Sequence, residues 1–129
     1  MTEQVPACGG ADALASWFGQ WPSFHDAEVV ELCLRRTAES TLIVHAWSWG
    51  PVPEGAKHSS REHECVVTFR MSEVLDLELT DFSSQNVVFG IDVTQMDGAW
   101  RVRLAQAYGL GGWIQCRSLS LSFKPGGPS

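Results

Sequence analysis

The spacing of hydrophobic residues changes from a helical period near the N-terminus to alternation over the rest of the chain. Leu14, Trp17 and Phe18 follow i, i+3, i+4 spacing, which predicts a short helix over residues 11–20 with one apolar face. From residue 27 onward, apolar and polar positions alternate, which is typical of half-buried antiparallel strands. Three of the alternating apolar sets are Val30/Leu32/Leu34, Leu75/Leu77/Leu79 and Val87/Phe89/Ile91/Val93.

These patterns predict an α+β fold with one short N-terminal helix packed on a mainly antiparallel sheet of about six to seven strands, arranged as a meander. Asp97-Gly98 is the strongest hairpin signal, and a phase change in the last strand indicates a bulge near Arg117-Ser118. We expect a single domain over residues 11–124, with flexible tails at 1–10 and 125–129. The polar connection 50–63 predicts a long loop that is either mobile or functional.

Composition places the chain among globular proteins, because 44% of its 129 residues are hydrophobic and 19% are charged. No apolar run approaches the roughly 20 residues that a membrane-spanning helix needs. The N-terminus lacks the basic and apolar regions of a signal peptide, so we expect a cytoplasmic protein without membrane contacts. The four cysteines are far apart and form no CxxC pair, which favours reduced, buried thiols.

The segment Trp21-Pro22-Ser23-Phe24-His25-Asp26-Ala27-Glu28-Val29 places aromatic, imidazole and carboxylate groups in one predicted turn. The side chains of His25, Asp26 and Glu28 could orient a general base or begin a metal site. We favour a structural interpretation, with Trp21 and Phe24 filling the core between the helix and the sheet and Asp26 fixing the turn. Because neighbouring residues on an extended chain point to opposite sides, we expect His25 and Asp26 not to touch.

This segment, with the preceding Phe18-Gly19, resembles the opening of the immunity protein 50 family of bacterial polymorphic toxin systems. A second matching segment is Tyr108-Gly109-Leu110-Gly111-Gly112, followed by a strand containing Cys116. The resemblance implies a protein that binds and neutralises a cognate toxin domain. We expect no enzymatic activity, no cofactor and no metal. The residues that match the motifs and that we expect to determine turns are Trp21, Phe24, His25, Asp26, Glu28, Tyr108 and Gly109.

Acidic residues are concentrated between Met71 and Trp100, where six acids and no lysine or arginine account for the net charge of −6. If the two strands that contain Asp76, Glu78 and Asp92 pair, these carboxylates share one outer face. That face is either ordinary solvated surface or a patch complementary to a basic partner, such as a nuclease toxin. The same charge disfavours nucleic-acid binding, because no basic patch neutralises phosphates. Oligomeric state stays open.

Three further groups of residues complete the candidate chemistry. Trp47 and Trp49 are predicted on one face of a strand, as part of a toxin-binding surface or as packing residues. His58 and His63, with Glu62, Glu64 and the distant His45, lack a helical ligand spacing, so we expect no metal there. The glycine-rich segment after Tyr108 predicts a tight turn instead of a phosphate site. The alternative function is a small metal-dependent enzyme or a ligand-binding module, using the His25/Asp26/Glu28 turn or the Trp47/Trp49 face.

Overall fold

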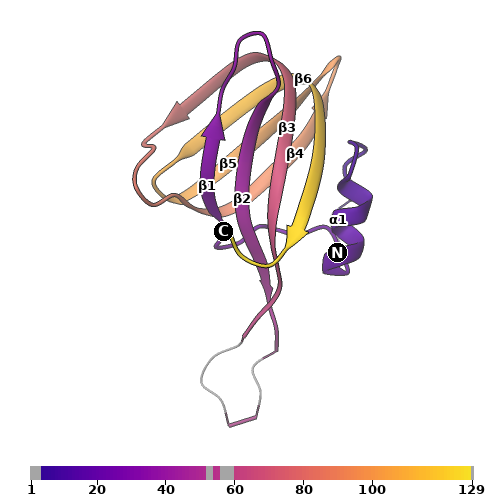
Figure 1. Cartoon of the computed structure of the whole chain (residues 1–129), viewed down its shortest axis with the longest axis vertical. Helices are drawn as coiled ribbons and strands as arrows, with labels where there is room; N and C mark the ends of the chain where they lie inside the picture. Colours follow the sequence, from indigo (N-terminus) through magenta and orange to yellow (C-terminus); the bar gives the residue numbers. More distant parts are fainter. Residues whose placement is uncertain (1–3, 52–53, 56–59, 129) are drawn as a thin grey trace.

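The computed structural model describes residues 4–51, 54–55 and 60–128, which form one helix and six strands (Figure 1). These elements are α1 (Ala11–Phe18), β1 (Glu28–Cys33), β2 (Ser40–Trp49), β3 (Arg61–Thr80), β4 (Val87–Met96), β5 (Ala99–Tyr108) and β6 (Gly111–Pro125). All neighbouring strands are antiparallel. The predicted α+β fold, with a short N-terminal helix and an antiparallel sheet, is confirmed. No helix among the described residues is long and apolar enough to cross a bilayer.

The strands form a closed barrel in the order β1-β2-β3-β6-β5-β4. Consecutive strands are neighbours except for β3 and β4: β3 lies beside β6, and β4 closes the barrel on β1. β3 and β6 are the two longest strands, of 20 and 15 residues. The first part of β3 pairs with β2 up to Met71, and the first part of β6 pairs with β5 up to Cys116. β3 therefore connects β2 to β6, and β6 connects β3 to β5, so that this long pair joins the strands β1–β2 to the strands β4–β5. Two predicted strands, around Cys65 and around Leu77, are one continuous strand in the structure.

The long pair bends in the middle, where Glu73 of β3 has a left-handed φ of 54°. The phase change expected in β6 is present, because Arg117 and Ser118 are both exposed between buried Cys116 and Leu119. The register shift itself lies in β3, between Val74 and Asp76. The extra residue is thus on the opposite strand from the one that the sequence indicated.

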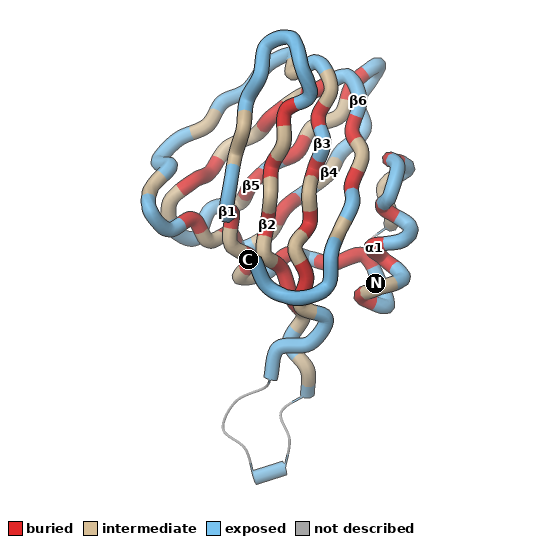
Figure 2. Tube along the Cα trace, in the orientation of Figure 1, coloured by how far each residue is buried: buried red, intermediate tan, exposed pale blue. Residues whose placement is uncertain are grey.

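The core lies inside the barrel, where buried residues alternate with more exposed ones along β2 and the first part of β3 (Figure 2). Buried side chains of β2 and β3 include Leu42, Val44, Cys65, Val67, Phe69 and Met71. All four cysteines fall within the described residues and are free, as expected, although Cys33 is only partly buried. Burial raises the pKa of both the Cys65 and Cys116 thiols to about 11, because the apolar interior disfavours the thiolate.

Two alternating sets are out of phase with their prediction, because single extra residues turn the strand over. In β1 the register shifts between Val29 and Glu31, so that Val29 is buried and Val30 is exposed. In β4 the register shifts on both sides of Val88, so that Val88 is buried and Phe89 is exposed. The prediction that Val30 and Phe89 face the core was therefore wrong.

The segment 21–29 closes the barrel between β1 and β4. Besides the Glu28–Val87 pair, the Val88 N–H donates to the Ala27 carbonyl at 2.9 Å and the Asp26 N–H donates to the Val88 carbonyl at 2.9 Å. Phe24 has a left-handed φ of 62° and is 1% exposed. Such a backbone is unfavourable for a bulky residue, so the packing of its ring in the core must hold it in place.

The N-terminal segment and α1 lie beside the last part of β6, beyond the end of its pairing with β5 (Figure 1). Gly9 forms a parallel bridge with Ser120, and the Leu121 N–H donates to the Gly9 carbonyl at 2.7 Å. Cys8 is buried. This part of the segment therefore packs on β6, whereas the sequence predicted a flexible tail through residue 10. At the other end, the Gly126 N–H donates to the Glu64 carbonyl at 2.8 Å, so residue 126 is also attached to the sheet.

Candidate functional site

The predicted acidic residues lie on the outer face of the half-barrel formed by β3, β6, β5 and β4. Glu78 pairs with Trp113, Trp113 with Arg103, and Arg103 with Asp92, so these four residues form one row across four strands. Asp76 lies in the adjoining outward row, opposite Gln115. The three carboxylates thus share one face, but β3 and β4 are not neighbours. At three strand spacings, Glu78 and Asp92 are about 14 Å apart.

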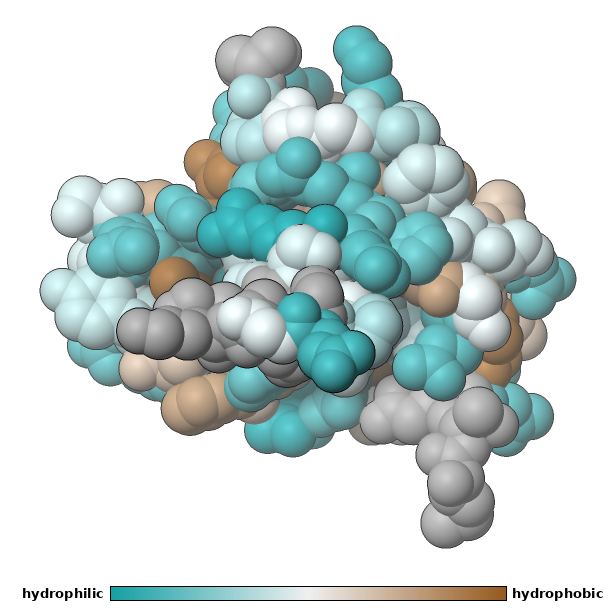
Figure 3. Space-filling model, turned by 90° about the horizontal axis from the view of Figure 1, so that it is seen from below, coloured by the Kyte–Doolittle hydropathy of each residue, from teal (hydrophilic) through white to brown (hydrophobic). Residues whose placement is uncertain are grey.

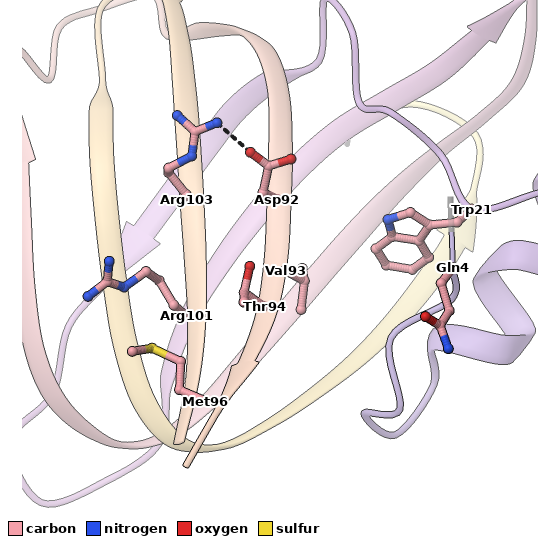
Figure 4. Close-up of a pocket in the computed structure, with 8 residues that line it drawn as sticks. All are labelled: Gln4, Trp21, Asp92, Val93, Thr94, Met96, Arg101 and Arg103. Carbon is pink, nitrogen blue, oxygen red and sulfur yellow. Dashed lines mark hydrogen bonds and ion pairs between the residues drawn. The ribbon is translucent and has the colours of Figure 1, made fainter. Parts of the chain in front are cut away.

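Asp92 differs from the other two acids because it forms an ion pair with Arg103 (Figure 4). Figure 4 also shows Arg101 on the same strand, beside a cavity of about 550 Å³. The guanidinium of Arg101 lies 4.3 Å from the centre of the Trp113 ring. Arg103 therefore lies between Asp92 and Glu78 in their row, and Arg101 lies in the adjoining row that contains Asp76. Among the described residues, Asp76 and Glu78 form no ion pair, so the uncompensated negative charge is at β3.

The aromatic candidates lie at the other end of β3, where β2 ends. Trp47 and Trp49 contact each other edge to face with ring centres 6.2 Å apart. The Trp49 indole N–H donates to Asp26 Oδ2 at 3.4 Å, which connects β2 to the turn that closes the barrel. His25 Nε2 lies 3.7 Å from the same oxygen. His25 and Asp26 therefore do approach each other, against expectation, because the left-handed φ of 67° at Asp26 makes the chain turn instead of extend.

A cavity of about 210 Å³ lies at this end of the molecule, lined by Phe18, Gln20, Pro22, Ser23, His25, Trp47, Ser48 and Trp49. Trp47 is 8% exposed, and its buried indole N–H has no hydrogen-bond partner among the described residues. The Arg61 guanidinium lies 3.8 Å from the centre of the Trp47 ring. Seen from below, the surface is mostly hydrophilic, with strongly hydrophobic residues scattered singly (Figure 3). This end is thus a small aromatic hollow in polar surroundings.

The histidine candidates do not assemble into a metal site in the described part of the chain. His58 lies outside the described residues. His63, predicted in a loop, belongs to β3, which begins at Arg61 and so shortens the predicted connection 50–63. His45 Nε2 lies 2.8 Å from Glu64 Oε2. No group of three His, Cys, Asp or Glu residues suited to a metal ion occurs among the residues described.

Sequence reasoning missed one polar pair that could carry chemistry. Ser48 Oγ lies 3.0 Å from His63 Nδ1, on strands that pair across the start of the connection. A hydroxyl beside an imidazole is the beginning of a nucleophilic site, which also needs an orienting group and oxyanion donors. Within the described residues no carboxylate is hydrogen-bonded to the His63 ring. Recognising residues 49 and 61 as the ends of one hairpin could have found this pair.

Asn86 is a second residue that the sequence did not reveal. Its side-chain Oδ1 accepts hydrogen bonds from the N–H of buried Leu110 at 2.9 Å and of Ser83 at 3.0 Å. Its carbonyl accepts the Val29 N–H at 2.8 Å. Asn86 therefore joins the two motif segments, 21–29 and 108–112, which are far apart in sequence. Gly109 has a φ of 82°, as a tight turn predicts, and any side chain there would clash with the carbonyl of Gln85.

These features define a small antiparallel barrel with a pair of unpaired acids and a pair of tryptophans at opposite ends of β3, and with no assembled catalytic group among the residues described. A family model for Immunity protein 50 matches residues 10–123, and the chain therefore belongs to the immunity protein 50 family. Comparisons with curated proteins and with solved structures gave no match. The family recognised from the two sequence motifs is confirmed.

Proposed function

We propose that the protein binds and neutralises a cognate toxin domain of a bacterial polymorphic toxin system, and that it acts in the cytoplasm without catalysing a reaction. The match to the immunity protein 50 family over residues 10–123 is the observation that carries this proposal. The geometry is compatible with a binding protein. Its polar clusters are mostly pairs on the surface, and its glycine-rich turn is occupied by structural contacts with Asn86.

The acidic end of β3 is our first candidate for the toxin-binding surface. Asp76 and Glu78 are exposed and carry charge that no described cation neutralises. A toxin with a basic active-site surface, such as a nuclease, has the complementary charge, which speeds association and selects the partner. Asp92 lies at the margin of this surface, because Arg103 pairs with it. Trp47 and Trp49 are candidates for a separate contact at the other end of β3.

Calorimetry can test this proposal, using as candidate toxin the C-terminal domain of any large secreted protein encoded by a neighbouring gene, with growth rescue in parallel. We expect tight one-to-one binding and rescue. The double variant Asp76→Lys/Glu78→Lys should bind at least tenfold more weakly. The control Glu31→Lys/Glu54→Lys has the same net charge at exposed positions elsewhere. If both variants lose the same affinity for the toxin domain, the effect is due to net charge alone. If the affinity of Asp76→Lys/Glu78→Lys is unchanged, these two acids are not part of the toxin-binding surface.

The hollow at Trp47 favours a second candidate function, a module that binds a small ligand. A buried indole N–H without a partner is costly, and a ligand that provides an acceptor would relieve the cost. The cavity of about 210 Å³ limits such a ligand to roughly ten heavy atoms, because a cavity of about 150 Å³ holds benzene. A melting assay with small carboxylates and amides tests it, because a ligand that binds the folded state raises the melting temperature. If none of these compounds raises the melting temperature, the ligand-binding function is refuted and toxin binding is the one candidate function that is left.

A further inference from the structure

The last part of β3 is a free edge of the barrel. The pairing of β2 with β3 ends at Ser40 and Met71, while the pairing of β3 with β6 continues to Thr80. Among the described strands, residues 72–80 therefore have β6 on one side and no strand on the other. Figure 1 shows this part of β3 crossing behind the top of the β1–β2 hairpin. A free edge presents unpaired backbone groups that another strand can bind.

The interior of the barrel is incompletely covered at this edge. Leu77, Ile114 and Val102 form one inward row across β3, β6 and β5. Ile114 and Val102 are fully buried, whereas Leu77, at the end of the row, is 37% exposed. Leu75, at the register shift, is 44% exposed. The sequence predicted both leucines in the core, and they are exposed because the row has no further strand to cover it.

The backbone of Leu77 is available on the open side. Its N–H donates to Asp76 Oδ1 at 2.9 Å, a local bond at an exposed position, and is thus not used in the ladder with β6. In an antiparallel strand the N–H and carbonyl of one residue point to the same side, and those of its neighbours point to the other. The N–H and carbonyl of Leu77 therefore both face the free edge, where an incoming strand could replace the carboxylate.

We propose that the toxin adds a strand to this edge, through a segment in which lysine or arginine alternates with apolar residues. This inference rests on the proposed function and specifies how the partner binds. Basic residues of the added strand would lie on the outer face, opposite Asp76 and Glu78, and apolar ones would extend the row of Leu77. Backbone hydrogen bonds supply affinity in this mode of recognition, and the alternating side chains supply specificity.

The same edge is protected against a second copy of this chain. In an antiparallel pair centred on Leu77, Asp76 of one copy lies opposite Glu78 of the other, and like charges directly opposite are destabilising. The register shift beside Leu75 further disturbs a regular ladder. The charge of the edge therefore selects a basic strand and rejects the acidic strand of another copy.

Amide hydrogen exchange, followed by NMR on the full chain, tests strand addition with two probes. The first is the toxin domain defined above, and the second is a nine-residue peptide of alternating lysine and valine. We expect the Leu77 amide to exchange at least tenfold more slowly with either probe. Leu77→Pro removes the N–H from the open side only, where proline is tolerated, and should weaken domain binding at least tenfold more than Leu77→Ala, which keeps the N–H.

The outcomes separate this inference from the proposed function. If the domain binds without protecting the Leu77 amide, strand addition is wrong and the immunity function stands. If the domain does not bind but the peptide protects the amide, the edge accepts strands and the proposed partner is wrong. Protection by neither probe overturns strand addition. If Leu77→Pro does not fold, the exchange measurements on the natural chain still decide, and a dimer paired at this edge would also refute the proposal.

Discussion

Asn86 should be among the most important polar residues for stability. It is 4% exposed and lies between β3 and β4. Its Oδ1 accepts the N–H groups of Leu110 and Ser83, and its Nδ2 donates to the Ser83 carbonyl at 2.9 Å. Asn86→Ala removes all three bonds, while the carbonyl of residue 86 stays available to Val29. The variant therefore tests the side chain alone.

The expected loss follows from the surroundings of each group. Leu110 is 1% exposed, so its N–H loses its partner in a buried site, which costs about 1–3 kcal/mol. The two bonds to Ser83 are only partly buried and contribute about 1 kcal/mol each. The free energy of unfolding should therefore fall by about 3–5 kcal/mol, a large share of the stability of a domain this size.

Urea unfolding monitored by tryptophan fluorescence measures this loss. The control is Ser83→Ala, because the Ser83 hydroxyl bonds only Gln85 and is exposed, whereas Asn86 uses the backbone of Ser83. This control should cost less than about 1 kcal/mol. If Asn86→Ala is no more destabilising than the control, the side chain does not hold the two motif segments together and the reasoning fails.

Three further predictions concern the turn at Gly109, the segment around Phe24 that closes the barrel, and the thiol of Cys65. Gly109→Ala should lower the free energy of unfolding by more than about 2 kcal/mol, because Cβ meets the Gln85 carbonyl, whereas Gly98→Ala, with similar φ and open space, should cost about 1 kcal/mol; equal losses in urea unfolding would contradict the clash. Phe24→Ala should lower the free energy of unfolding by about 3–5 kcal/mol, whereas Phe89→Ala, at an exposed position, should lower it little. A small loss for Phe24→Ala in urea unfolding would mean that relief of the backbone strain at residue 24 outweighs the lost packing. Burial raises the pKa of the Cys65 thiol from 9.0 to about 11. The thiol's contribution to the free energy of unfolding is therefore fully present below pH 9 and is lost as the pH rises toward 11. Urea unfolding should therefore show about 1 kcal/mol less stability from this thiol at pH 10 than at pH 8, and Cys65→Ala should show a smaller pH dependence; an unchanged dependence would contradict its burial as a neutral thiol.

Local features of the fold were predictable from the sequence. Helical spacing located α1, and Asp97-Gly98 located the β4–β5 hairpin, where Met96 pairs with Ala99. Alternation identified the antiparallel strands, and two short motifs identified the family. Each of these signals depends on residues that are close in sequence, so the side chains themselves carry the information.

The faces of several strands could not be predicted, because a single extra residue turns every following side chain to the other side. The shift beside Val30 exposed a valine that was expected in the core, and the shifts around Val88 exposed Phe89. Whether a strand accommodates such a residue depends on the hydrogen bonds of its partner strand. That partner is distant in sequence, so no local pattern records the bulge.

The sequence by itself determined the composition of each strand, the acidic stretch and the motifs of the family. Only the tertiary structure decided that β3 lies beside β6, that Arg103 neutralises Asp92, and that Trp49 reaches Asp26. It also decided that the pairing of β2 with β3 ends at Ser40 and Met71, which leaves Leu77 at a free edge. The physical reason is that strand order and closure follow from burying the faces of all strands together, and contacts between distant segments exist only once that assembly forms.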